Sequence, residues 1–143
     1  MNLKIKIPWI FKCILPIVYA YLIYIASSKD TSSISLPPYT DKLIHFVEFG
    51  LLCLMTCWTL SSDRIGAKKI YKIIIAIGIT SLYGVSDEIH QSFTPHRSVE
   101  FFDWLADTVG AITAGSLWQV LAYKRQLKVK SLITGENPYT SIK

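Results

Sequence analysis

The residues best suited to chemistry lie in two polar stretches of a largely apolar chain. The longer stretch, Ser81–Asp107, holds carboxylates, two histidines, an arginine and a glutamine between two strongly apolar runs. The shorter stretch, Asp41–Glu48, adds two more carboxylates, a histidine and a lysine. An ionisable group inside a membrane segment costs roughly 2.5–3.5 kcal/mol, so such a concentration of them indicates a functional site.

The spacing of these residues places them on single faces of three helices, because residues four and seven positions apart share one side of a helix. The three sets are Asp41, His45 and Glu48; Tyr83, Asp87 and Gln91; and Asp103, Asp107 and Gly110. Polar faces at one depth in a membrane are expected to face each other. The sequence therefore predicts a polar pocket between these helices, covered by the loop Ser92–Glu100.

Such a pocket would support acid–base chemistry or the binding of a charged head group. The candidates for acid and base are Glu48, Asp87 and Asp107, with His45 as a proton relay. Arg97 offers paired donors to a phosphate or carboxylate, which suits a lipid-linked or wall-linked ligand with an anionic head. The ligand-binding candidates are Asp41, Lys42, Tyr83, Glu88, Gln91, Arg97 and Asp103.

A metal or cofactor site is not predicted. The carboxylates and histidines would be suitable ligands for a divalent cation. However, the sequence contains no motif with metal-ligand spacing such as HExxH.

Structural explanations compete with these functional ones. Asp41, Lys42, Glu100 and Asp103 also fit solvated helix ends, and His90 and His96 fit surface histidines of a loop. Glu48, Asp87 and Asp107 lie within or beside apolar segments, where pairing with His45 and Arg97 would hold the bundle together.

The composition indicates a membrane protein of one domain. The chain has 143 residues, of which 51% are hydrophobic and 17% charged. Soluble domains carry about 25% charged residues. The net charge of +5 is divided among separate clusters, which argues against a nucleic-acid-binding surface. Cys13, Cys53 and Cys57 all fall in apolar runs and are expected to pack rather than to form a disulfide or bind a metal.

Four apolar runs predict an all-α bundle of four membrane-spanning helices, at about residues 8–26, 43–60, 70–90 and 101–123. The isoleucine-rich third run also fits a buried strand, but its length favours a helix. The first run also fits a cleaved signal peptide, although further apolar runs follow it. We expect the tail, 124–143, to be partly disordered.

The basic residues predict the orientation of the bundle. They gather at the N-terminus (Lys4, Lys6, Lys12), in the second loop (Arg64, Lys68, Lys69) and in the tail (Lys124, Arg125, Lys128, Lys130). The first and third loops have no basic excess. By the positive-inside rule both termini are cytoplasmic and the predicted pocket opens on the outer face.

The two polar stretches resemble the sequence pattern of the VanZ-like family. The first block is Asp41, Lys42, His45, Glu48 and Phe49; the second comprises Tyr83, Asp87, Glu88, Gln91, Phe93, Pro95, Arg97, Asp103, Asp107 and Gly110. The resemblance covers about residues 37 to 115. It implies a small multi-span protein of the bacterial cell membrane, linked to low-level resistance to the glycopeptide teicoplanin.

Two positions depart from the family pattern. His96 stands where the family often has glycine, and Phe49 stands where tyrosine is usual. Neither departure removes a charged group, so both bear on the geometry of the pocket rather than on its charge.

Three functions remain open. The first is an envelope protein whose outer pocket binds a lipid-linked or wall-linked ligand and so affects glycopeptide susceptibility. The second is a hydrolase or transferase of the outer leaflet, and the third is a small proton- or cation-coupled transporter. The bilayer is the predicted partner, while the ligand and the oligomeric state are left open.

Overall fold

Apolar runs long enough to form helices account for the architecture. The computed structural model describes residues 8–30, 37–61 and 68–135, and this part contains four helices and no strand. They are α1 (Trp9–Ser27), α2 (Thr40–Leu60), α3 (Lys69–Gln91) and α4 (Phe101–Thr134). The predicted all-α fold is confirmed, and the isoleucine-rich third run is a helix.

Three of the helices are long and apolar enough to cross a membrane: α1, α2 and α3, with 19, 21 and 23 residues. Helix α1 has only two buried residues, Ile23 and Ser27, and presents most of its large apolar side chains outward. Such a surface suits lipid rather than water. Together these features make the chain a membrane protein.

Helix α4 differs from the predicted fourth run in its length. It has 34 residues and continues beyond Tyr123 through the basic part of the predicted tail to Thr134. Residues 136–143 lie outside the described part of the chain. Helix α4 is also less apolar than the others, since Asp103, Asp107 and small residues occupy its buried face. That α4 is a fourth membrane span stays a prediction.

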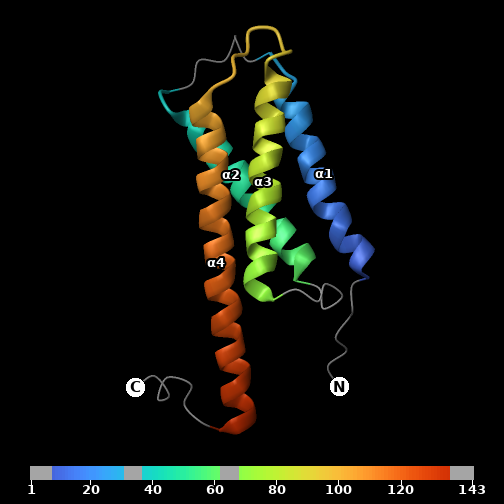
Figure 1. Cartoon of the computed structure of the whole chain (residues 1–143), viewed down its shortest axis with the longest axis vertical. Helices are drawn as coiled ribbons and strands as arrows, with labels where there is room; N and C mark the ends of the chain where they lie inside the picture. The colour runs from blue at the N-terminus through green and yellow to red at the C-terminus, as the bar shows by residue number, and fades with distance from the viewer. Residues whose placement is uncertain (1–7, 31–36, 62–67, 136–143) are drawn as a thin grey trace.

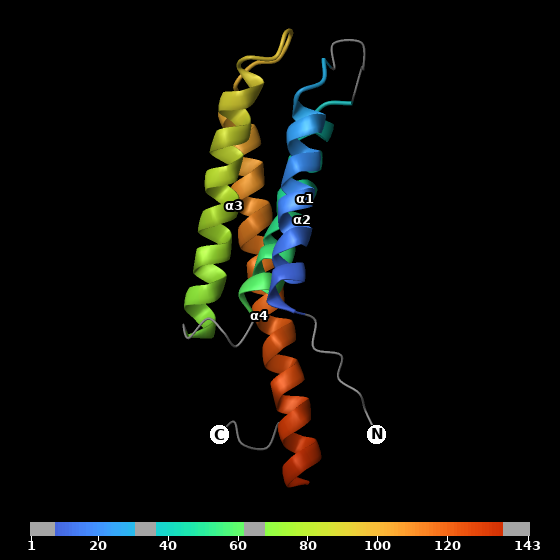
Figure 2. The ribbon, with the colours of Figure 1, turned by 90° about the vertical axis from the view of Figure 1, so that its right-hand side faces the viewer.

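The helices run alternately up and down. Figure 1 shows the start of α1 and the end of α4 at the same end of the bundle. In the view turned by 90°, α1 and α2 lie beside each other, as do α3 and α4 (Figure 2). The side of the membrane that each end faces stays a prediction, and Lys4, Lys6 and Arg64, three of the basic residues behind it, lie outside the described residues.

The contact between α2 and α4 is the most extensive in the bundle. It depends on glycine, because a Cβ atom at Gly110 would overlap the carbonyl oxygen of Phe46. A Cβ atom at Gly50 would lie 3.4 Å from the Gly110 carbonyl oxygen. Small residues allow this close approach of helices in a membrane.

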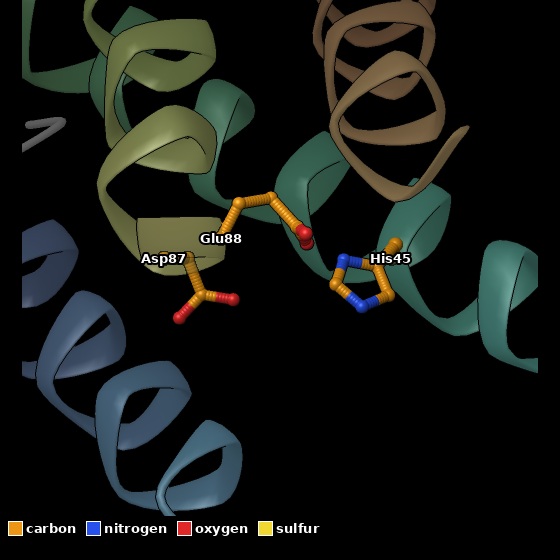
Figure 3. Close-up of side chains that lie close together, drawn as sticks. All are labelled: His45, Asp87 and Glu88. Atoms are coloured by element: carbon orange, nitrogen blue, oxygen red, sulfur yellow. The ribbon is translucent and has the colours of Figure 1, made fainter. Parts of the chain in front are cut away.

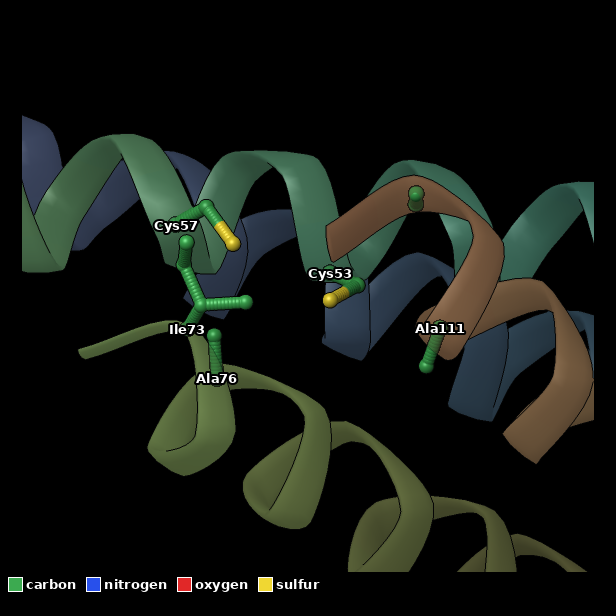
Figure 4. Close-up of a cluster of buried hydrophobic side chains, with 6 residues drawn as sticks. Cys53, Cys57, Ile73, Ala76 and Ala111 are labelled. Atoms are coloured by element: carbon green, nitrogen blue, oxygen red, sulfur yellow. The ribbon is translucent and has the colours of Figure 1, made fainter. Parts of the chain in front are cut away.

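A small apolar core joins α2, α3 and α4 in the half of the bundle away from the polar residues. It consists of Cys53, Cys57, Ile73, Ala76, Ala111 and Ala114 (Figure 4). All three cysteines are free. The predicted packing role of Cys53 and Cys57 is confirmed.

Candidate functional site

A polar pocket lies at the end of the bundle where α1 and α3 end and α2 and α4 begin. Its volume is about 370 Å³. Seven predicted site residues line it: Asp41, His45, Glu48, Asp87, Gln91, Arg97 and Asp103. Residues of α2, α3, α4 and the loop between α3 and α4 therefore meet in one place.

His45 and Asp107 form a buried pair behind the pocket wall. The Nδ1 atom of His45 lies 2.9 Å from Oδ1 of Asp107, and Asp107 is fully buried. With a proton on Nδ1 this contact is an N–H donated to the carboxylate, and Nε2, on the other side of the ring, lies 3.9 Å from Oδ2 of Asp103. A carboxylate in this position fixes the orientation and tautomer of the imidazole.

The close fit of Asp107 against α3 requires a glycine. A Cβ atom on Gly84 would lie 2.7 Å from Oδ2 of Asp107. The carboxylate of α4 thus packs directly on the backbone of α3, at the level where His45 of α2 meets it.

Asp87 joins α3 to α1. Its Oδ1 accepts a hydrogen bond of 2.7 Å from Ser27, and its Oδ2 accepts one of 2.8 Å from Gln91. Helix α1 also lines the pocket through Ile23, Ala26 and Ser27. The sequence predicted a pocket of three helices and placed Ser27 in a loop, so the fourth wall was missed.

Lys42 holds a cluster of carboxylates at the rim of the pocket. Its Nζ lies 2.7 Å from Asp41, 2.5 Å from Glu100 and 2.7 Å from Asp103. Lys42 and Glu100 therefore connect the first turn of α2 to the start of α4, which a merely solvated helix end would not do. The three carboxylates surround a positive charge supplied by the chain itself.

Glu88 is buried beside His45. Its Oε2 accepts a hydrogen bond of 2.8 Å from the backbone N–H of Glu100. Its Oε1 is buried and has no hydrogen-bond partner among the described residues. In Figure 3 the Glu88 carboxylate points toward the ring of His45. Asp87 directly precedes Glu88 in α3.

Tyr83 and His90 face α1 rather than the pocket. The Tyr83 hydroxyl donates to the carbonyl oxygen of Ala20 at 2.6 Å. The ring of His90 packs on Tyr24 with centroids 4.3 Å apart, and its Nε2 lies 2.8 Å from the Ser28 hydroxyl. Both side chains hold α1 against α3, although Tyr83 was predicted to contact the ligand.

The loop before α4 presents His96 and Arg97 to the pocket. His96 has a φ of 60°, in the left-handed region that favours glycine. The family pattern often has glycine at this position, and the backbone conformation gives the physical reason.

Two groups of side chains offer metal-binding geometry in the described part of the chain: His45 with Asp87 and Glu88, and Asp41 with Glu100 and Asp103. Lys42 already lies among the second group. The first group is buried and combines one imidazole with two carboxylates.

A larger hollow of about 760 Å³ lies at the opposite end of the bundle. Its wall includes four cationic side chains, those of Lys12, Lys69, Lys72 and Arg125, together with Trp58 and Trp118. Basic and aromatic residues of this kind are typical of the cytoplasmic boundary of membrane proteins. The acidic site and the basic hollow therefore mark opposite ends of the molecule.

The profile of the VanZ/LLP1 family matches residues 6–122, which include the whole acidic pocket. The chain belongs to the VanZ/LLP1 family. An uncharacterized protein of Schizosaccharomyces pombe is 33% identical over 91 residues, covering 64% of this chain and 53% of the yeast protein. The chain spans about half the length of this relative, and no solved structure matches.

Membership in the VanZ/LLP1 family agrees with the resemblance found in the sequence and with the membrane helices. The relative comes from a yeast, so the comparison does not restrict the family to bacteria. What the acidic pocket does has to be argued from its own geometry.

Proposed function

We propose that the acidic pocket binds the polar head of a lipid-linked or cell-wall-linked molecule, and that the protein thereby affects susceptibility to teicoplanin. The observation that carries this proposal is the two-sided lining of the pocket. One wall of the pocket is apolar and consists of Ile23, Ala26 and Ile44. The other wall is polar and consists of carboxylates, Gln91 and Arg97. An amphiphile presents the same two kinds of surface.

The position of the pocket in the bundle supports a ligand held in the membrane. Large apolar side chains are exposed along the outer surfaces of all the helices, for example at Leu22, Leu43 and Leu82. A molecule with an acyl or polyprenyl chain would lie along such a surface and reach the pocket with its head. A freely soluble ligand would gain nothing from this apolar approach.

Arg97 has a particular part in the proposed binding. It lines the pocket at the loop before α4, where its guanidinium can donate two parallel hydrogen bonds to a phosphate or carboxylate. Lys42, which lies among three carboxylates at the rim, carries a single ammonium group and cannot offer this paired geometry. An anionic head group therefore depends most on Arg97.

The binding function is tested by teicoplanin susceptibility in bacteria that express the Arg97→Ala protein. Loss of a charge-assisted hydrogen bond costs about 1.5–3 kcal/mol, or roughly tenfold or more in affinity. We expect Arg97→Ala to lose its effect on susceptibility and Arg125→Ala, which removes the same charge at the opposite end, to keep it. Equal protein levels in the membrane must be verified. Unchanged susceptibility with Arg97→Ala would refute the proposal.

A second candidate function, catalysis, is favoured by the His45–Asp107 pair. A fully buried carboxylate that orients an imidazole beside further carboxylates is suited to proton transfer. The enzyme would be a hydrolase or transferase of the outer leaflet, with Glu48, Asp87 or Asp107 as acid and base and His45 as relay.

Catalysis and binding differ in their response to neutral isosteres. Under catalysis, Asp87→Asn and Glu48→Gln abolish function although the protein folds and inserts, since an amide cannot exchange protons as a carboxylate does. A comparison of the membrane lipids of cells with wild-type and Asp87→Asn protein would reveal an accumulated substrate. Full activity of both variants would exclude the enzymatic function.

A further inference from the structure

Among the described residues, the acidic pocket gathers more carboxylic side chains than cationic ones. Lys42 lies among the three carboxylates of the rim, and Arg97 lines the same pocket. Deeper in, the buried side chains of Asp87, Glu88 and Asp107 lie near His45, and the half-buried Glu48 lines the same pocket. Buried carboxylates require protons, cations or metal ions as compensation.

Three of these deep side chains have the arrangement of metal ligands. One nitrogen of His45 and one oxygen each of Asp87 and Glu88 lie within 4.8 Å of one another. Ligand atoms at about 2.1 Å from a common ion are roughly 3–4 Å apart. Small side-chain rotations are therefore enough to bring the three atoms around one ion.

The hydrogen bonds of these side chains leave ligand atoms available. When Nδ1–H donates to Asp107, the neutral imidazole carries its lone pair on Nε2, which lies 3.9 Å from Asp103, beyond hydrogen-bond distance. The backbone N–H of Glu100 donates a hydrogen bond to Oε2 of Glu88. The other oxygen, Oε1, is buried and has no hydrogen-bond partner among the described residues. Glu88 as a whole is 4% exposed. Metal ligands are typically held in this way by surrounding hydrogen bonds.

Two hydrogen bonds also orient the carboxylate of Asp87. Ser27 and Gln91 each donate to one of its oxygens, and each oxygen retains a second lone pair. All three side chains are buried, with 8% of His45 and 4% of Asp87 exposed. The three side chains project toward one another from α2 and α3 (Figure 3).

We propose that His45, Asp87 and Glu88 form a binding site for a divalent transition-metal ion, with Zn²⁺ the preferred ion. An imidazole with two carboxylates favours Zn²⁺ over the hard ions Ca²⁺ and Mg²⁺, which prefer oxygen ligands alone. The site lies in the pocket of the proposed function, but metal binding does not require the membrane-linked ligand. A bound cation would make this acidic pocket attractive to an anionic head group.

The test uses the full-length protein in detergent, stripped of metal with a chelator and titrated with ZnCl₂ by calorimetry. We expect saturable binding of one Zn²⁺ ion per chain, weakened about tenfold or more by Asp87→Asn and by Glu88→Gln. Asp30→Asn, which removes an exposed carboxylate outside the pocket, is the matched control and should bind as the wild type does.

Two further measurements separate loss of the metal site from misfolding and from zinc binding by cysteine. Thermal unfolding without metal verifies that the variants fold, and added Zn²⁺ should raise the unfolding temperature of the wild type but not of Glu88→Gln. A Cys53→Ser, Cys57→Ser protein should retain binding, because these thiols are the competing zinc ligands. Absent binding by the folded wild type, binding lost with the cysteines, or equal binding by Glu88→Gln would each overturn the site.

The metal site and the proposed head-group binding can fail separately. Arg97→Ala should bind Zn²⁺ normally even if teicoplanin susceptibility changes. Conversely, a wild-type protein that binds Zn²⁺ while Arg97→Ala leaves susceptibility unchanged would retain the metal site and refute the binding function.

Discussion

At the residue scale, the backbone of His96 is the point where the pocket loop is most constrained. Its φ of 60° lies in the left-handed region, which costs a residue with a Cβ atom about 1–2 kcal/mol. The next residue is Arg97, whose N–H bonds to the carbonyl oxygen of Thr94 at 3.2 Å. The turn that strains His96 thus sets the direction in which Arg97 leaves the loop.

We predict that His96→Gly raises the free energy of unfolding by up to about 1 kcal/mol, the relief of strain less the entropy of an added glycine. His90→Gly is the control and should lower stability, because glycine costs about 1 kcal/mol in the last turn of α3 and the change also removes the ring that packs on Tyr24. Thermal or denaturant unfolding in detergent compares the two. A loss of stability in His96→Gly equal to that in His90→Gly would contradict the strain.

The sequence predicted which residues come together at the pocket better than it predicted which side chain each of them contacts. The helical spacing of Asp41, His45 and Glu48 correctly indicated one face of α2 toward the pocket. It did not indicate that His45 pairs with Asp107 or that Tyr83 turns to α1. Those details depend on the rotation and depth of each helix, which the spacing within one helix does not contain.

At the element scale, the crossing of α2 and α4 determines how closely the polar faces meet. Gly110 lies against the backbone of Phe46, one residue after His45 in α2. Asp107 lies one turn before Gly110 in α4. The absence of a side chain at Gly110 therefore brings the two helices near enough for the His45–Asp107 hydrogen bond of 2.9 Å.

We predict that Gly110→Ala lowers the free energy of unfolding by several kcal/mol and disrupts the pocket, because a backbone carbonyl cannot move aside as a flexible side chain can. Gly78→Ala is the control, since a Cβ atom there meets nothing within 4 Å. In a helix this exposed change should be neutral or stabilising by up to about 1 kcal/mol. Equal unfolding temperatures of the two variants would refute the role of Gly110.

The helices were well predicted, because a long run of apolar residues is a strong signal for a helix that spans a membrane. The predicted spans match the observed helices to within a few residues for α1, α2 and α3. The end of α4 was not predicted, because its last turns are basic and lack the apolar character that marked the other runs. The part played by α1 was missed for a similar reason, since Ser27 is polar but still helical.

At the scale of the whole molecule, acidic and basic groups separate to the two ends. The acidic pocket lies at one end, and the hollow lined by Lys12, Lys69 and Arg125 lies at the other. The orientation itself stays a prediction: Lys12, Lys69 and Arg125 are among the basic residues from which the positive-inside rule places this end in the cytoplasm.

We predict that a cysteine replacing Ser98, an exposed residue of the pocket loop, reacts with a membrane-impermeant maleimide in intact cells. A cysteine replacing Thr134, at the exposed end of α4, should react only after lysis. Both replacements are made in a Cys13→Ser protein, which is also the control, because Cys13 is only half-buried whereas Cys53 and Cys57 are buried. The reverse pattern would invert the topology, and labelling of both from outside would exclude α4 as a span.

The unequal extent of α4 on either side of its contact with α2 has a mechanical consequence. Asp103 precedes Gly110 by about 10 Å along the helix axis, whereas Thr134 follows it by about 36 Å. Helix α4 therefore extends much farther from its closest approach to α2 toward the basic end than toward the pocket. If α4 tilts as a rigid rod about this contact, a movement of 1 Å at Asp103 becomes about 3–4 Å at Thr134.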